Sequence, residues 1–260
     1  MLDAPTGTLR VHRRNIPFTL DKGISHRAAI GLLVLASDHT IEHEWREMLR
    51  LDGVGFYEAR IANSPTITPE TLRRMEGELT KTAALIRPGE RIDVLAYGCT
   101  SGTMVIGEEA VFARLREARP GVACTSPITG ALAGLAALGA RRIALLTPYI
   151  DSINQMMRDY IEARGVEVPV MATFNNENDN EVARISAASL EAAILDLGDQ
   201  RDVDAVFVSC TSLRVAPLIE RLEQKLGKPV TASNHAMAWH ALRLAGYRES
   251  MPGLGRLMRL

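Results

Sequence analysis

One pattern occurs twice in the sequence, as D-V-L-A-Y-G-C-T-S at Asp93–Ser101 and as D-A-V-F-V-S-C-T-S at Asp204–Ser212. Each copy has an acidic residue, a short apolar run and then Cys-Thr-Ser, and the cysteine (Cys99 or Cys210) stands six positions after the acid. An apolar run that ends in a polar turn is typical of a buried parallel strand followed by a loop. In open α/β sheets, chemistry takes place at the carboxyl ends of strands. The pattern therefore predicts two similar units, each of which places one cysteine at the end of a strand.

The segments around these stretches alternate between strand-like and helix-like patterns, and the order restarts at residue 141. Residues 27–140 contain four strand–helix units, and residues 141–260 contain four more. This predicts an α/β fold of two Rossmann-like halves with parallel sheets, related by a pseudo-twofold axis, with the active site in the cleft between them. The halves can exchange terminal segments. The expected strands are 27–37, 54–61, 92–98, 122–126, 141–149, 166–174, 205–209 and 229–232. The expected helices are 41–51, 68–86, 102–118, 128–138, 153–164, 181–197, 214–226 and 235–244.

Composition narrows the classes of protein to which the chain can belong. Its 260 residues are 47% apolar and 23% charged, which is ordinary for a globular protein with a large core. The net charge of -1 gives no electrostatic basis for binding nucleic acid or an acidic membrane surface. Three cysteines without metal-ligand spacing, and no signal-peptide or membrane-length apolar run, favour a cytoplasmic location. We expect residues 1–26, which include a basic cluster, to form a surface arm packed on the domain.

The paired cysteines suggest acid–base or nucleophilic chemistry. Backbone N–H groups and the dipole of a following helix can lower the pKa of a thiol at each position. Hydroxyl groups follow both cysteines, and they belong to Thr100, Ser101, Thr211 and Ser212. Such a pocket can bind a carboxylate and stabilise the enolate-like charge that forms when its α-carbon loses a proton. Two cysteines facing one carbon suit proton transfer, or thiolate addition to a double bond with rotation and elimination. The third cysteine, Cys124, fits a buried core position.

At these residues the chain resembles the aspartate/glutamate racemase superfamily. Within it the chain is most similar to the branch of maleate cis-trans isomerases and arylmalonate decarboxylases, which includes the ectoine-utilisation isomerase-like proteins. T-P-Y at Thr147–Tyr149 and D-N-E-V at Asp179–Val182 add to the resemblance, which extends from Arg27 onward. It implies a cofactor-independent site between two halves, a homodimer, and catalytic roles for Cys99 and Cys210. It also implies that substrate is bound by Tyr149, Asn180, Thr100 and Ser101.

One position departs from the isomerase pattern. Where maleate isomerases have an asparagine that binds a substrate carboxylate after the first strand, this chain has Asp38. A carboxylate there would repel a dianion such as maleate and favour a substrate with a cationic nitrogen. We therefore expect an amino acid or a cyclic amidine acid, and an ectoine-type compound satisfies both charges. His39 and His43 are spaced as metal ligands can be, but no third ligand is evident, so we expect no metal.

The sequence thus predicts a cofactor-independent isomerase or racemase of a small carboxylic acid, for example in ectoine or hydroxyectoine utilisation. Cys99 and Cys210 would act on opposite faces of the substrate, and Asp38 would set substrate choice. The substrate carboxylate would be bound by Thr100, Ser101, Tyr149, Asn180, Thr211 and Ser212. Three alternatives stay open. They are a maleate-type cis-trans isomerase, an arylmalonate-type decarboxylase in which Cys99 is dispensable, and a small-molecule binding domain without enzymatic activity.

Overall fold

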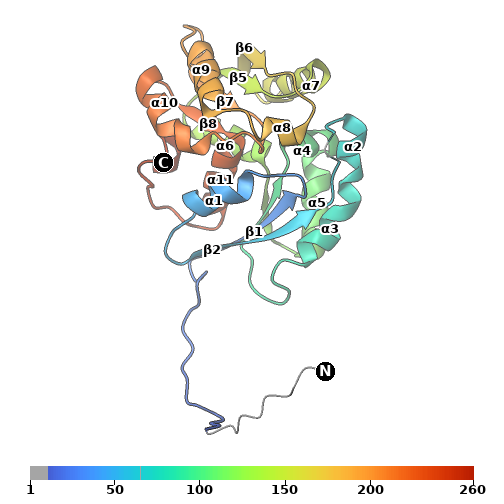
Figure 1. The fold of residues 1–260 in the computed structure, drawn as a ribbon, viewed down its shortest axis with the longest axis vertical. Coiled ribbons are helices and arrows are strands. Elements are labelled where there is room, and N and C mark those ends of the chain that lie inside the picture. Colours follow the sequence, from blue (N-terminus) through green and yellow to red (C-terminus); the bar gives the residue numbers. More distant parts are fainter. Residues whose placement is uncertain (1–10, 65) are drawn as a thin grey trace, which may run out of the picture.

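Two four-stranded parallel sheets form the framework of the protein, and a computed structural model describes residues 11–64 and 66–260 of it (Figure 1). The strands of the first sheet are β1 (Ala28–Leu35), β2 (Val54–Ile61), β3 (Val94–Gly98) and β4 (Ala123–Thr125). Those of the second sheet are β5 (Arg142–Thr147), β6 (Glu167–Thr173), β7 (Ala205–Val208) and β8 (Val230–Ala232). The strand order is β2-β1-β3-β4 in one sheet and β6-β5-β7-β8 in the other. The predicted α/β fold with two alike halves is confirmed.

The acidic residue that opens each repeated stretch aligns the strands. Asp93 Oδ2 accepts a hydrogen bond of 2.8 Å from the backbone N–H of Ala29, at the start of β1. Asp204 Oδ2 accepts two, from the N–H groups of Arg141 (3.0 Å) and Arg142 (2.9 Å), at the start of β5. Each acid thus fixes the register of the strand that follows it, β3 or β7, against the neighbouring strand, β1 or β5. Every residue of β1 is buried. Fully buried parallel strands explain the continuous apolar runs in the sequence.

The helices follow the predicted order, but several are interrupted. The first sheet is accompanied by α1 (Ile41–Met48), α2 (Pro69–Arg74), α3 (Glu76–Ala84), α4 (Thr100–Ile106), α5 (Glu108–Ala118) and α6 (Pro127–Ala137). The second has α7 (Asp151–Glu162), α8 (Asp179–Val182), α9 (Ala187–Gly198), α10 (Ile219–Leu226) and α11 (Ser233–Leu244). The expected helices 68–86, 102–118 and 181–197 are each divided into two. Gly107 divides the second of these, because its φ of +100° ends α4. The expected helix 214–226 begins instead as a 3₁₀ turn at Ala216–Leu218.

Helices α6 and α11 lie together in the middle of the body, between the two sheets (Figure 1). Although α11 follows the second sheet in sequence, it also contacts β1, β3 and β4 of the first sheet. The two helices approach closely at Gly130, where an added Cβ would lie 2.8 Å from the carbonyl oxygen of Ala236. This close crossing joins the two sheets into one body and sets how their strand ends face each other.

The N-terminal arm stands away from the body rather than packing on it (Figure 1). Phe18 is 81% exposed and Leu20 is 88% exposed, so the expected packing is wrong for residues 11–24, while residues 1–10 lie outside the described part. The core is complete without the arm, since β1 is already covered on both faces. No helix in residues 11–64 and 66–260 has the length and apolar character needed to span a bilayer.

Candidate active site

The two Cys-Thr-Ser stretches meet at one pocket beside the carboxyl ends of β3 and β7. About 410 Å³ lies empty among its lining residues and at its open mouth, and only about 20 Å³ of this can take the centre of a water-sized sphere, which is room for roughly one water molecule. Six of the nine predicted site residues contribute to its wall: Cys99, Thr100, Ser101, Tyr149, Cys210 and Thr211. The segment between β2 and α3 supplies another part of the wall through Asn63, Ser64, Ile67 and Leu72. Residues from both halves therefore surround a single small space.

Cys99 lies between β3 and the first turn of α4 and caps that helix. Its Sγ accepts a hydrogen bond of 3.2 Å from the N–H of Gly102 and lies 4.0 Å from Ser101 Oγ. Burial raises the pKa of Cys99 to about 12, and the Gly102 N–H only partly opposes this. The expected lowering of this thiol's pKa is wrong, because loss of water around the sulfur outweighs one backbone donor.

Cys210 is held in an uncommon backbone conformation. Its φ is +134°, a region that residues with a side chain rarely adopt, and such strain costs on the order of 1–3 kcal/mol. No helix begins directly after it, so the expected effect of a helix dipole is absent at this position. Burial, with a smaller contribution from the charge of Asp179, raises the pKa of Cys210 well above its usual range, while Tyr149 opposes the rise. Both thiols are therefore neutral near pH 7.

Ser233 connects the two cysteine loops. Its hydroxyl accepts a hydrogen bond of 3.0 Å from the N–H of Cys210 and lies 3.0 Å from the hydroxyl of Thr100. The N–H of Cys210 is thus satisfied by a residue at the start of α11, and the same hydroxyl reaches the first half. The sequence analysis did not select Ser233, although its place at the end of a strand in the second half was a usable signal.

Tyr149 presents its phenol to the pocket from the loop after β5. Thr147 donates to Asn154 Oδ1 at 2.5 Å, and Asn154 Nδ2 donates to the carbonyl of Tyr149 at 2.7 Å, which fixes this loop. Burial raises the pKa of Tyr149 well above its usual range. The phenol is therefore a neutral hydrogen-bond donor at the pocket, as a carboxylate-binding role requires.

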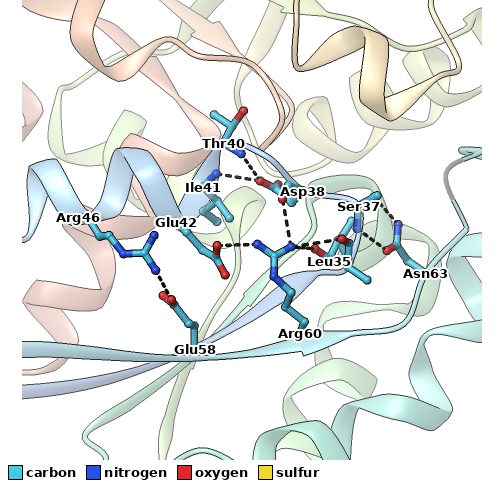
Figure 2. A network of polar contacts seen from close by, with 11 residues as sticks. Leu35, Ser37, Asp38, Thr40, Ile41, Glu42, Arg46, Glu58, Arg60 and Asn63 are labelled. Carbon is cyan, nitrogen blue, oxygen red and sulfur yellow. Dashed lines mark hydrogen bonds and ion pairs between the residues drawn. The ribbon is translucent and has the colours of Figure 1, made fainter.

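Asp38 does not line the pocket, and its carboxylate accepts hydrogen bonds at the start of a helix (Figure 2). Its Oδ1 accepts hydrogen bonds from the N–H groups of Thr40 (2.7 Å) and Ile41 (2.8 Å) at the start of α1. Its Oδ2 is buried and has no hydrogen-bond partner of normal geometry among the described residues, although the Thr211 hydroxyl is close enough to favour its charge. Burial raises the pKa of Asp38 to about 6. Below the loop, Arg60 Nη1 donates to three backbone carbonyls, those of residues 35, 36 and 38.

Asn180 and Ser212 also lie beside the pocket rather than in its wall. Asn180 Oδ1 is 2.6 Å from Nε2 of His39, which ties α8 to the loop before α1. Ser212 donates from Oγ to Asp179 Oδ1 at 2.6 Å. In the D-N-E-V stretch it is thus Asp179, one position before the predicted Asn180, that reaches the pocket wall. In the described residues no three His, Cys, Asp or Glu side chains converge as a metal site would need.

Comparison with known proteins identifies the family. Residues 71–258 match the arylmalonate decarboxylase family. The maleate isomerase of Nocardia farcinica is 30% identical over 240 residues, which cover 88% of this chain and 95% of that protein. The chain belongs to the arylmalonate decarboxylase family.

Two further relatives are an isomerase and a decarboxylase. A mutant of the maleate cis-trans isomerase of Nocardia farcinica, with a covalently bound succinylcysteine intermediate, has a TM-score of 0.81 at 29% identity, covering 89% of this chain and 98% of that one. The arylmalonate decarboxylase of Bordetella bronchiseptica is 34% identical over 150 residues, 57% of this chain and 62% of that protein. The maleate isomerases of Nocardia farcinica and Geobacillus stearothermophilus each match 88% of this chain, which supports an isomerase. A crystal structure of arylmalonate decarboxylase also covers 88% of this chain and 98% of that one, with a TM-score of 0.72 at 26% identity.

Within this family member, Glu44 supports the second cysteine loop from the first half. Its Oε1 accepts a hydrogen bond of 2.8 Å from the N–H of Ala216, and its Oε2 accepts one of 2.7 Å from Asn234 Nδ2. Asn234 also donates to the carbonyl of Thr211 at 2.8 Å. A buried carboxyl group of α1 thus holds the backbone that follows Cys210, so the first half supports the cysteine loop of the second.

Proposed function

We propose that the protein is a cofactor-independent isomerase of a small carboxylic acid, with Cys99 and Cys210 as its two acid–base groups. The observation that carries the proposal is that both thiols, from equivalent strand ends of two alike halves, contribute to the wall of one small pocket. A homodimer in the cytoplasm is part of the same proposal.

In racemisation, one cysteine acts as a thiolate after its proton has passed to solvent. The thiolate takes the α-proton of the substrate, the C–H bond breaks, and its electron pair enters an enolate of the neighbouring carboxylate. The other thiol then gives its proton to the opposite face of the carbon, so nothing is oxidised or reduced. The substrate carboxylate and its developing charge are held by neutral donors of Thr100, Ser101, Tyr149 and Thr211, which line the pocket, while Asn180 and Ser212 lie beside it.

A cis-trans isomerisation is the second form of this proposal, and the succinylcysteine intermediate of the Nocardia farcinica relative favours it. Here a thiolate sulfur bonds to one alkene carbon, the π bond breaks, and the other thiol gives a proton to the second carbon. Rotation about the new single bond and the reverse elimination then yield the other isomer. The same two sulfurs serve both reactions, and the substrate decides between them.

The substrate that we propose carries a cationic nitrogen as well as a carboxylate, as an amino acid or an ectoine-type cyclic amidine acid does. Asp38, whose Oδ2 is buried without a normal hydrogen bond, supports this because its negative charge disfavours a dianion nearby. Asp38→Asn tests its part in this. If discrimination between zwitterionic and dianionic ligands is unchanged in that variant, Asp38 does not select the substrate.

Proton NMR in D₂O tests the whole proposal with ectoine, hydroxyectoine, amino acids and maleate as candidate substrates. Deuterium should enter at the α-carbon, or cis should convert to trans, and both Cys99→Ser and Cys210→Ser should abolish turnover or change its stereochemistry. Retention of activity in Cys99→Ser alone would instead indicate an arylmalonate-type decarboxylase. Absence of any exchange or conversion would leave a binding domain as the better account.

A further inference from the structure

Asp179 is a buried carboxylate at the pocket, and neither the sequence pattern nor the proposed chemistry uses it. It is the first residue of α8, it is 4% exposed, and it lies in the same pocket wall as Cys99 and Cys210. Its negative charge raises the pKa of both thiols, although burial is the larger cause for each. One acid is therefore close enough to influence both reacting sulfurs.

Two hydroxyl groups, one from each half, hold this carboxylate in place. Ser37 Oγ donates to Asp179 Oδ2 at 2.7 Å, and Ser212 Oγ donates to Oδ1 at 2.6 Å. Asn63 Nδ2 donates in turn to Ser37 Oγ at 2.7 Å (Figure 2). The hydroxyl proton of Ser37 is therefore directed to the carboxylate of Asp179. A carboxylate offers about four acceptor positions, so each oxygen of Asp179 keeps capacity for another donor.

No cation of the protein balances this charge within the described part of the chain. Of the ion pairs found in residues 11–64 and 66–260, none includes Asp179 or Asp38. The described wall of the pocket contains no lysine, arginine or histidine. A buried carboxylate without a positive partner is costly, and hydroxyl donors offset only part of that cost. The described wall of the pocket therefore carries the negative charge of Asp179 and no positive charge that balances it.

We propose that Asp179 binds the cationic nitrogen of the substrate, an ammonium or amidinium group close to the carbon at which the two thiols react. This rests on the proposed function and refines it, because it assigns charge recognition to a residue in the pocket wall, with Asp38 behind it. The bound cation also cancels the field of Asp179 at the sulfurs. Substrate binding thus favours ionisation of the attacking thiol, whereas the thiols stay protonated without it.

The test compares L-aspartate with succinate, which lacks only the ammonium group, and adds ectoine as an amidinium probe. Calorimetry measures the affinity of each for the wild type, Asp179→Asn and Ser37→Ala. The wild type should bind aspartate or ectoine more tightly than succinate, and Asp179→Asn should lose about tenfold to a hundredfold of that preference, as expected for one charged hydrogen bond. Ser37→Ala keeps the charge and should keep the order of preference. Equal affinities in the wild type, no detectable binding of any probe, or an unchanged order in Asp179→Asn would each overturn the proposal.

A second measurement needs no ligand and separates charge from structure. The hydroxyls of Ser37 and Ser212 can donate or accept, so an asparagine at position 179 retains both contacts while losing the charge. Alkylation of each cysteine by iodoacetamide, followed by mass spectrometry against pH, should show lower thiol pKa values in Asp179→Asn than in the wild type. Unchanged profiles would mean that Asp179 only joins the halves. If charge preference is found but no acid exchanges deuterium, the proposed reaction fails while this assignment stands. If the enzyme turns over dicarboxylates in preference to acids with a cationic nitrogen, the proposed reaction stands and the assignment of Asp179 fails.

Discussion

Replacement of Glu44 by glutamine tests how burial controls ionisation where α1 supports the Cys210 loop. Glu44 is 2% exposed, and it accepts hydrogen bonds from the N–H of Ala216 and from Asn234 Nδ2. Burial raises the pKa of Glu44 from its ordinary 4.5 to about 7, and the two donors only partly oppose the rise. The neutral carboxyl group is therefore the favoured form in the folded protein below that pH.

The raised pKa of Glu44 makes the free energy of unfolding depend on pH. Because the folded-state pKa lies above that of the unfolded chain, the stabilising contribution of Glu44 is fully present below about pH 4.5 and is lost as the pH rises through about 7. The whole change amounts to about 3 kcal/mol, and about 2 kcal/mol of it falls between about pH 5 and about pH 7.5. Glutamine does not titrate. The free energy of unfolding of the wild type, minus that of Glu44→Gln, should therefore decrease by about 2 kcal/mol over this interval.

Urea unfolding followed by circular dichroism measures this difference at several pH values. Glu47 is an exposed glutamate on the same helix, and Glu47→Gln is the matched control for removal of one carboxyl group from α1. If the wild-type free energy of unfolding minus that of Glu44→Gln does not change with pH, the reasoning is refuted, because Glu44 would then have the same pKa in the folded and the unfolded protein. A difference that increases with pH would show that the two donors outweigh burial and that Glu44 is ionised in the native protein.

Three further substitutions test the packing and the loops. Gly130→Ala should lower the free energy of unfolding by about 1–3 kcal/mol, because the new Cβ would lie 2.8 Å from backbone atoms of Ala236 and Met237 that cannot move independently. Gly77→Ala, in α3 with no atom within 4 Å of the new Cβ, should raise it by about 0.5–1 kcal/mol, and thermal unfolding of both variants checks the pair. Ser233→Ala leaves the buried N–H of Cys210 without its acceptor, so it should cost about 1–3 kcal/mol of stability and lower kcat more than it raises KM. Unaltered kcat in Ser233→Ala would contradict a positioning role for this hydroxyl.

The sequence was sufficient for the framework because the framework depends on local pattern. The continuous apolar run of β1 and the acid at the same offset in both repeated stretches lead directly to two parallel sheets, and Asp93 and Asp204 are found at equivalent strand starts. Helix interruptions were not predicted, since a change of direction such as that at Gly107 depends on which helix packs next. The expected packing of the arm was wrong for residues 11–24 for a similar reason: apolar side chains such as Ile16, Phe18 and Leu20 do not by themselves specify a surface that covers them.

Pairing of the cysteines could be predicted from their offset, but the electrostatics of the pocket could not. A strand-end cysteine before a helix suggests a lowered thiol pKa, whereas burial on all sides raises it at both positions. Likewise, D-N-E-V contains three adjacent polar residues, and only the turn into α8 decides that Asp179 rather than Asn180 reaches the pocket wall. Burial and the direction of a side chain arise from segments far apart in sequence, so no local spacing encodes them.

The two halves share a sequence pattern, yet they build unlike sites. Ser126 follows β4 and caps α6 by accepting from the N–H of Thr129. Ser233 follows β8 at the corresponding place in the second half, and it instead contacts the N–H of Cys210 and the hydroxyl of Thr100. Cys99 likewise has an ordinary extended conformation before α4, while Cys210 has a φ of +134°. Because the backbone conformation and the neighbouring hydrogen bonds differ between Cys99 and Cys210, the two thiols differ in environment. In the isomerisation that we propose, the duplication would supply the two opposing groups, and the divergence of their supports would allow each thiol to be tuned to its own step.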